Sequence, residues 1–160
     1  MTVTFTLNGR ERSFSGDPRA PLIDVLRDEF RLTGSKAVCG EGFCGACIVY
    51  VDRVPKASCL LPLGALEAAE VVTIEGIATL ETLNAVQQAF VDHDVVQCGM
   101  CFPGMVMTLT HFLNDNPTPT RSDVKVALTG NICRCTGYER IIDAVMSLQT
   151  ATLAASDATP

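Results

Sequence analysis

Hydrophobic and polar positions alternate at the start of the chain, which is the period of a half-buried β-strand. The alternation covers Val3 to Leu7, and the dipeptide Asn8-Gly9 that follows favours a tight hairpin turn. Residues 10–15 then return as the second strand. Shorter apolar runs predict two further strands, at residues 48–51 and 71–74.

Between the hairpin and the later strands, the apolar positions change to helical spacing. Pro21 is a favourable residue for opening a helix, and Leu22, Val25, Leu26 and Phe30 would share one face. A glycine-rich cysteine loop follows at residues 38–46. Strands flanking one helix and one cysteine loop predict a β-grasp-like domain.

The second half of the chain is helical in its pattern throughout. Three sets of residues at helical spacing and one shorter apolar run predict four short helices, with Pro117-Thr118-Pro119 separating the second from the third. The first, second and fourth helices have the faces Leu80, Leu83, Val86, Gln87 and Phe90; Met105, Val106, Leu109, Phe112 and Leu113; and Ile141, Ile142, Val145, Met146 and Leu148; the third is suggested by Val124, Val126 and Leu128. We therefore predict an α+β chain in which residues 1–76 form the first domain and residues 77–160 form a small helical bundle ending in a frayed tail.

Composition narrows the class of protein. The 160 residues carry a formal net charge of −6 with no cluster of Lys or Arg, so we expect no nucleic-acid partner. No apolar segment is long enough for a membrane span, and residues 1–5 show no signal-peptide pattern. Eight cysteines in a chain that we expect to be cytoplasmic favour metal binding over disulfides.

The cysteines fall into two groups of four. The first is Cys39, Cys44, Cys47 and Cys59, and its opening C-x4-C-x2-C spacing is that of plant-type 2Fe–2S ferredoxins. Gly40, Gly42 and Gly45 interleave these cysteines, which allows the backbone to wrap closely around a charged cluster. Backbone N–H groups can then point at the sulfurs.

The second group is Cys98, Cys101, Cys133 and Cys135. The first pair ends just before Pro103, so it would lie at a helix N-terminus, where the helix dipole favours a thiolate. The second pair lies between the third and fourth predicted helices, with Arg134 adding a positive charge. Zinc bound by four cysteines is an alternative for either group, and a disulfide framework is another. The glycine-rich spacing favours iron–sulfur clusters.

Three long segments carry a family resemblance. They run from Cys39 to Cys47, from Gln97 to Gly104 and from Gly130 to Tyr138. In this order they resemble the small iron–sulfur subunit of the molybdenum hydroxylases, the xanthine oxidase family. The resemblance covers about residues 2–150 and implies an N-terminal plant-ferredoxin-like domain followed by a C-terminal four-helix bundle.

The resemblance also implies a function and partners. The chain would relay single electrons from the molybdenum cofactor of a large partner subunit, through two 2Fe–2S clusters, to FAD in a medium subunit or to another acceptor. Gln97 and Cys135 would contact the molybdopterin, and the first cluster would face the electron exit. The residues show no substrate pocket or catalytic acid–base pair in this chain. A free-standing two-cluster electron carrier is the alternative, and an exposed apolar patch around Gln97 and Cys135 would count against it.

Overall fold

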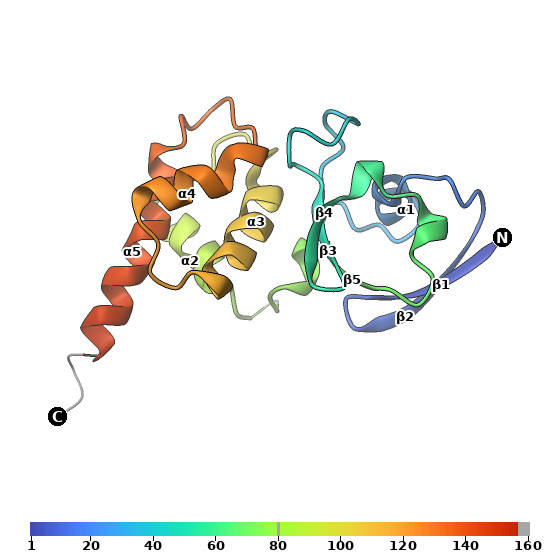
Figure 1. Ribbon diagram of the computed structural model, residues 1–160, viewed down its shortest axis with the longest axis horizontal. Helices are drawn as coiled ribbons and strands as arrows, with labels where there is room; N and C mark the ends of the chain where they lie inside the picture. The colour runs from blue at the N-terminus through green and yellow to red at the C-terminus, as the bar shows by residue number, and fades with distance from the viewer. Residues whose placement is uncertain (80, 157–160) are drawn as a thin grey trace.

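The computed structural model describes residues 1–79 and 81–156 and shows an α+β chain in two halves that lie side by side (Figure 1). The N-terminal half holds a mixed five-stranded sheet in the order β2-β1-β5-β3-β4. The C-terminal half is helical. The strands are β1 (Thr2–Leu7), β2 (Arg10–Ser15), β3 (Ile48–Val51), β4 (Val54–Ala57) and β5 (Glu70–Val72). The predicted α+β class is therefore confirmed.

The hairpin of β1 and β2 forms as predicted, with both turn residues in the left-handed region: Asn8 at φ 49° and Gly9 at φ 75°. This backbone is typical of the two-residue turns whose twist matches the flanking strands. β5 pairs parallel with β1 and antiparallel with β3. It ends at Val72, two residues before the predicted end, because the N–H of Thr73 donates to the Asn8 side chain instead of to a strand.

The helix α1 (Leu22–Asp28) packs on the sheet and buries three of the four residues of the predicted apolar stripe, whereas Phe30 lies two residues beyond the helix and is partly buried against the same core. Leu22, Val25 and Leu26 are at most 3% exposed, and they join Val3, Phe5 and Val49 of the strands in one core. Fully burying a side chain of this size contributes about 1.5–3 kcal/mol. This core fixes the position of α1, whose far end leads into the first cysteine loop.

The C-terminal half contains α2 (Ala85–Asp92), α3 (Phe102–Asp115), α4 (Arg121–Ala127) and α5 (Glu139–Ser156). Their buried side chains form a second core, which includes Phe90, Met105, Leu109, Ile141 and Val145. Two helices begin with a capping box, Asn84 with Gln87 at α2 and Thr120 with Asp123 at α4. Within the described residues, no helix is long and apolar enough to cross a membrane.

Two details of the helical prediction are wrong. The first helix begins at Ala85 rather than near Leu80, because Asn84 caps it; Leu83 is outside the helix and 48% exposed, and Leu80 lies outside the described residues. The tail that was predicted to be frayed is helical as far as Ser156, and its residues 157–160 lie outside the described residues.

The two halves meet where α3 lies against β3. The Tyr50 hydroxyl on β3 donates a 2.6 Å hydrogen bond to the carbonyl oxygen of Met107 on α3. Ile48 and Tyr50 of the first half also pack against the helical core. This junction brings the first cysteine loop close to the start of α3.

Candidate metal centres

The first cysteine group lies on two segments at one end of the sheet. Cys39, Cys44 and Cys47 are in the loop between α1 and β3, and Cys59 is in the 3-10 turn Ser58–Leu60 after β4. Gly45 has a φ of +71°, and a Cβ there would overlap the carbonyl oxygen of Gly130. Glycine at this position therefore allows both the backbone turn and the close approach of the other half.

Side chains outside the cysteine group hold its loop in place. The Arg27 guanidinium on α1 donates to the carbonyl oxygens of Thr33 at 2.9 Å and Ser35 at 2.8 Å. The Ser58 hydroxyl donates to the Cys47 carbonyl oxygen at 2.7 Å. Because Ser58 is fully buried and adjacent to Cys59, this bond fixes Cys59 beside Cys47. The sequence reasoning did not identify Arg27 or Ser58.

The four thiols of this group approach one another as two pairs. The N–H groups of Glu41 and Cys44, with the Cys44 thiol, lower the pKa of Cys39 to about 6. The Glu41 nitrogen lies 3.4 Å from Cys39 Sγ. Burial, followed by the Cys47 thiol, raises the pKa of Cys59 to about 11. Cys39 is therefore paired with Cys44, and Cys59 with Cys47.

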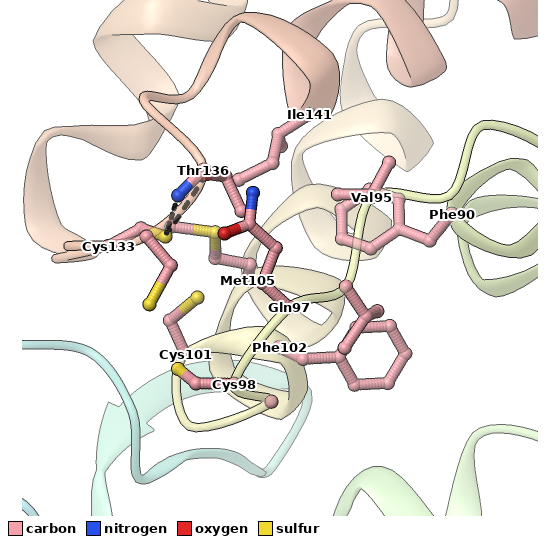
Figure 2. Close-up of a pocket in the computed structure, with 13 residues that line it drawn as sticks. Phe90, Val95, Gln97, Cys98, Cys101, Phe102, Met105, Cys133, Thr136 and Ile141 are labelled. Carbon is pink, nitrogen blue, oxygen red and sulfur yellow. Dashed lines mark hydrogen bonds between the residues drawn. The ribbon is translucent and has the colours of Figure 1, made fainter.

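The second cysteine group lies where three helix ends meet. Cys98 is in the loop after α2, and Cys101 is the N-cap residue of α3, as the position of Pro103 predicts. Cys133 and Cys135 lie between the 3-10 turn Leu128–Gly130 and α5. Figure 2 shows the sulfurs of Cys98, Cys101 and Cys133 turned toward one another.

The thiols of the second group are also paired. The Met100 N–H, followed by the Cys135 thiol, lowers the pKa of Cys98. Burial, followed by the Cys133 thiol, raises the pKa of Cys101 to about 12. Burial also acts to raise the pKa of Cys133, but hydrogen bonds outweigh it and lower the pKa. Cys98 is thus paired with Cys135, and Cys101 with Cys133.

Hydrogen bonds join the two cysteine groups directly. The Ile132 N–H donates to the Cys44 carbonyl oxygen at 2.9 Å. This bond joins a cysteine of the first group to the residue that precedes Cys133 of the second. Beside this link, the buried Asn131 side chain lies 3.5 Å from the Gly45 carbonyl oxygen. A cavity of about 180 Å³ lies between the groups and is lined by Cys44 from one, and by Cys101 and Cys133 from the other.

The residues predicted to meet a pterin are on the surface beside the second group. Gln97 and Cys135 are both exposed, and in Figure 2 the Gln97 side chain extends toward the sulfurs. Exposed apolar side chains lie near them in the sequence: Val96 and Met100 are each 46% exposed and Ile132 is 49% exposed. Met100 and Ile132 line the same cavity as Cys135, so exposed apolar side chains lie beside this cysteine.

The donor sets fit 2Fe–2S clusters. Such a cluster takes four thiolates, two on each iron, and each group offers two close thiol pairs. All eight cysteines are free, so none is committed to a disulfide. Among the described residues, no three His, Cys, Asp or Glu side chains gather around a single metal ion. Paired thiols with backbone N–H donors suit a dinuclear cluster better than one zinc ion.

The chain is similar to known iron–sulfur proteins along nearly its whole length. Residues 5–71 match the family described as 2Fe-2S iron-sulfur cluster binding domain, and residues 73–146 match the 2Fe-2S binding domain family. The nicotinate dehydrogenase small FeS subunit of Eubacterium barkeri is 41% identical over 91% of this chain and 92% of its own length. The nicotine 6-hydroxylase small subunit of Paenarthrobacter nicotinovorans is 41% identical over 91% of this chain and 88% of its own length.

A solved structure has the same fold. A chain of quinoline 2-oxidoreductase from Pseudomonas putida 86 superimposes with a TM-score of 0.90 at 41% identity, covering 99% of this chain and 98% of that one. The match extends over both halves, so the arrangement of sheet and helices in this chain is that of a known protein structure.

Proposed function

Since this chain belongs to the family of small iron–sulfur subunits of the molybdenum hydroxylases, we propose that its two cysteine groups are the ligands of two 2Fe–2S clusters. The chain is an electron-transfer subunit of a multi-subunit molybdenum-dependent oxidoreductase. Cys39, Cys44, Cys47 and Cys59 hold the first cluster, and Cys98, Cys101, Cys133 and Cys135 hold the second. The observation that carries this assignment is that each group of four cysteines lies inside a separate match to a 2Fe-2S binding family, residues 5–71 for the first group and residues 73–146 for the second.

The role of the protein is to hold the two sites close together and to shield their charge. Each 2Fe–2S cluster, when bound, takes up and releases one electron. The N–H groups of Glu41 and Met100 face the sulfurs of Cys39 and Cys98 and offset negative charge there. The bond from Ile132 N–H to the Cys44 carbonyl gives a short route through bonds between the sites.

The surface around the second site is proposed to meet the large molybdenum subunit. Gln97 and Cys135 contact its molybdopterin, and the exposed side chains of Val96 and Met100 are covered by it. Electrons then enter at the second site and leave from the first. The exposed Phe43 and Leu60, 56% and 59% exposed, flank the first site and suit a second partner there, which we propose to be a medium FAD subunit.

The domain arrangement follows the same assignment. We propose that residues 1–76 are a plant-ferredoxin-like β-grasp domain and that residues 77–160 are a domain in which α2 to α5 form a four-helix bundle. The buried residues form two cores, one drawn from residues 3–71 and one from residues 74–145, which supports a division in this region of the chain. Eight free cysteines suit a reducing compartment, so we propose a cytoplasmic holoenzyme.

The experiment is to purify the chain at native expression with whatever it binds, and to measure iron, sulfide, molybdenum and flavin per chain. About four irons and four sulfides, with molybdenum and flavin in larger partner chains, are expected. The same iron content with no partner and no molybdenum would support the free-standing carrier instead. Zinc in place of iron would contradict the redox function.

The pterin contact has its own test, with Gln97→Ala as the variant. Gln97 is not a cysteine and lies on the surface, so the iron content should be unchanged while less molybdenum subunit co-purifies. Gln88→Ala is the matched control, because Gln88 is an exposed glutamine on α2 whose side-chain amide donates to Asp92, on the same helix. Equal recovery of molybdenum with both variants would contradict the proposed contact.

A further inference from the structure

A threonine hydroxyl lies against one sulfur of the second site. Thr136 Oγ1 is 3.1 Å from Cys133 Sγ, and the Thr136 N–H donates to the same sulfur at 3.4 Å (Figure 2). Among the described residues, this is the only hydrogen bond between a cysteine sulfur and the hydroxyl of another residue's side chain. In the first site, the corresponding bond to Cys39 comes from the backbone of Glu41.

The direction of the hydroxyl bond follows from the chemistry of the ligand. A thiol can donate or accept, but a cysteine bound to iron is a thiolate and has no proton to donate. With the cluster in place, the Thr136 hydroxyl must therefore be the donor. The Tyr138 N–H donates to Thr136 Oγ1 at 3.2 Å, which uses a lone pair of the oxygen and leaves its proton for the sulfur.

Tyr138 also fixes the cysteine on its other side. Its hydroxyl accepts the Cys133 N–H at 2.8 Å and donates to the Asn131 carbonyl oxygen at 3.1 Å. Tyr138 has a φ of +69°, a conformation that costs a non-glycine residue free energy. The turn is held in this conformation by these bonds, so Cys133 and Thr136 have a fixed relative geometry.

We propose that Thr136 is a positioning residue that raises the reduction potential of the second cluster through its hydrogen bond to the Cys133 sulfur. The proposal rests on the proposed function, because it requires a cluster on Cys133. One electron arrives from the molybdenum partner and the same electron leaves toward the first cluster, while the proton stays on Thr136 Oγ1. The reduced cluster carries one more negative charge, and a hydrogen bond to a charged acceptor is stronger than one to a less charged acceptor. The hydroxyl therefore favours the reduced form.

The test compares two pairs of proteins, and the members of each pair differ by one hydroxyl: the wild type with Thr136→Val, and Thr136→Ser with Thr136→Ala. Thr136→Val replaces the hydroxyl by a methyl group of similar shape, and Thr136→Ala differs from Thr136→Ser only in lacking the hydroxyl. Redox titration of the holoenzyme, followed by electron paramagnetic resonance, reports the potential of each cluster separately. Thr136→Val should lower the reduction potential of one cluster and leave that of the other unchanged. The reduction potential of the same cluster should be lower in Thr136→Ala than in Thr136→Ser.

Thr129→Val is the control, because the Thr129 hydroxyl donates to the Val126 carbonyl oxygen and not to a cysteine of either site. It should leave both potentials unchanged. Equal potentials in Thr136→Val and the wild type, or in Thr136→Ala and Thr136→Ser, would overturn the proposal. So would equal shifts of both clusters. Iron analysis distinguishes failure of this proposal from failure of the proposed function. About four irons per chain without a shift in potential would refute only the role of Thr136, whereas a wild type without clusters would refute the proposed function.

Discussion

Gly104 is the point of closest packing between the helical half and the first cysteine loop. It lies in the first turn of α3, and a Cβ at this position would overlap the Gly45 carbonyl oxygen. The same Cβ would lie 2.8 Å from the Gly45 carbonyl carbon and 3.1 Å from Ala46 Cα. All three neighbours are backbone atoms in the loop that holds Cys44 and Cys47. Gly104→Ala should therefore separate α3 from the loop.

The expected cost combines two opposing effects. Replacing glycine by alanine in a helix stabilises it by up to about 1 kcal/mol. Inserting a methyl group into a packed site costs about 1–3 kcal/mol, and backbone neighbours place Gly104 at the upper end of that range. The net loss of unfolding free energy should be about 2 kcal/mol. For a chain of this length, that corresponds to a melting temperature lower by about 4–8 °C.

The assay is thermal unfolding of the cluster-loaded chain, followed by the visible absorbance of the clusters. Gly130→Ala is the matched control, since a Cβ at Gly130 meets nothing within 4 Å and Gly130 does not have a positive φ. It should melt within about 1 °C of the wild type. If Gly104→Ala also melted with the wild type, α3 and the loop would not be in the contact described here.

Three further predictions concern single side chains. Cys59→Ser should reduce the iron content by about half and leave the spectrum of the second cluster intact, because its four ligands are on other segments; loss of both spectra would contradict separate sites. Tyr50→Phe should lower the unfolding free energy by about 1 kcal/mol without changing the iron content, because it removes the bond to Met107, and an unchanged denaturant midpoint would argue against that bond. Asn84→Ala should lower the unfolding free energy by about 1 kcal/mol in the same denaturant measurement, because the α2 cap is lost, and Asn84→Ser should largely restore that free energy.

The elements with a clear period in the sequence were predicted correctly. The β1–β2 hairpin follows from alternation and from Asn8-Gly9, and α1 follows from Pro21 and one apolar stripe. β4 was missed, because Pro55 and Lys56 interrupt any apolar alternation over Val54–Ala57. Within the described sheet, β4 is an edge strand next to β3. An edge strand can accommodate proline, so it can form without a run of alternating apolar residues.

The cysteine groups could be read from spacing, but their relation to each other could not. The bond between Ile132 and Cys44 joins residues far apart in the sequence, and no local pattern indicates it. Thr136 and Tyr138 are in the segment that carries the family resemblance, yet their bonds to Cys133 depend on the left-handed backbone at Tyr138. Such a conformation in a tyrosine is set by the surrounding hydrogen bonds rather than by the preference of the residue itself.

The central claim is that one chain holds two separate 2Fe–2S clusters. Electron paramagnetic resonance of the fully reduced protein tests it most directly, because each reduced 2Fe–2S cluster contributes one unpaired electron. We predict two distinguishable signals of equal intensity, which together account for about two spins per chain. A single signal with about one spin per chain, or a colourless protein with no signal, would contradict the claim.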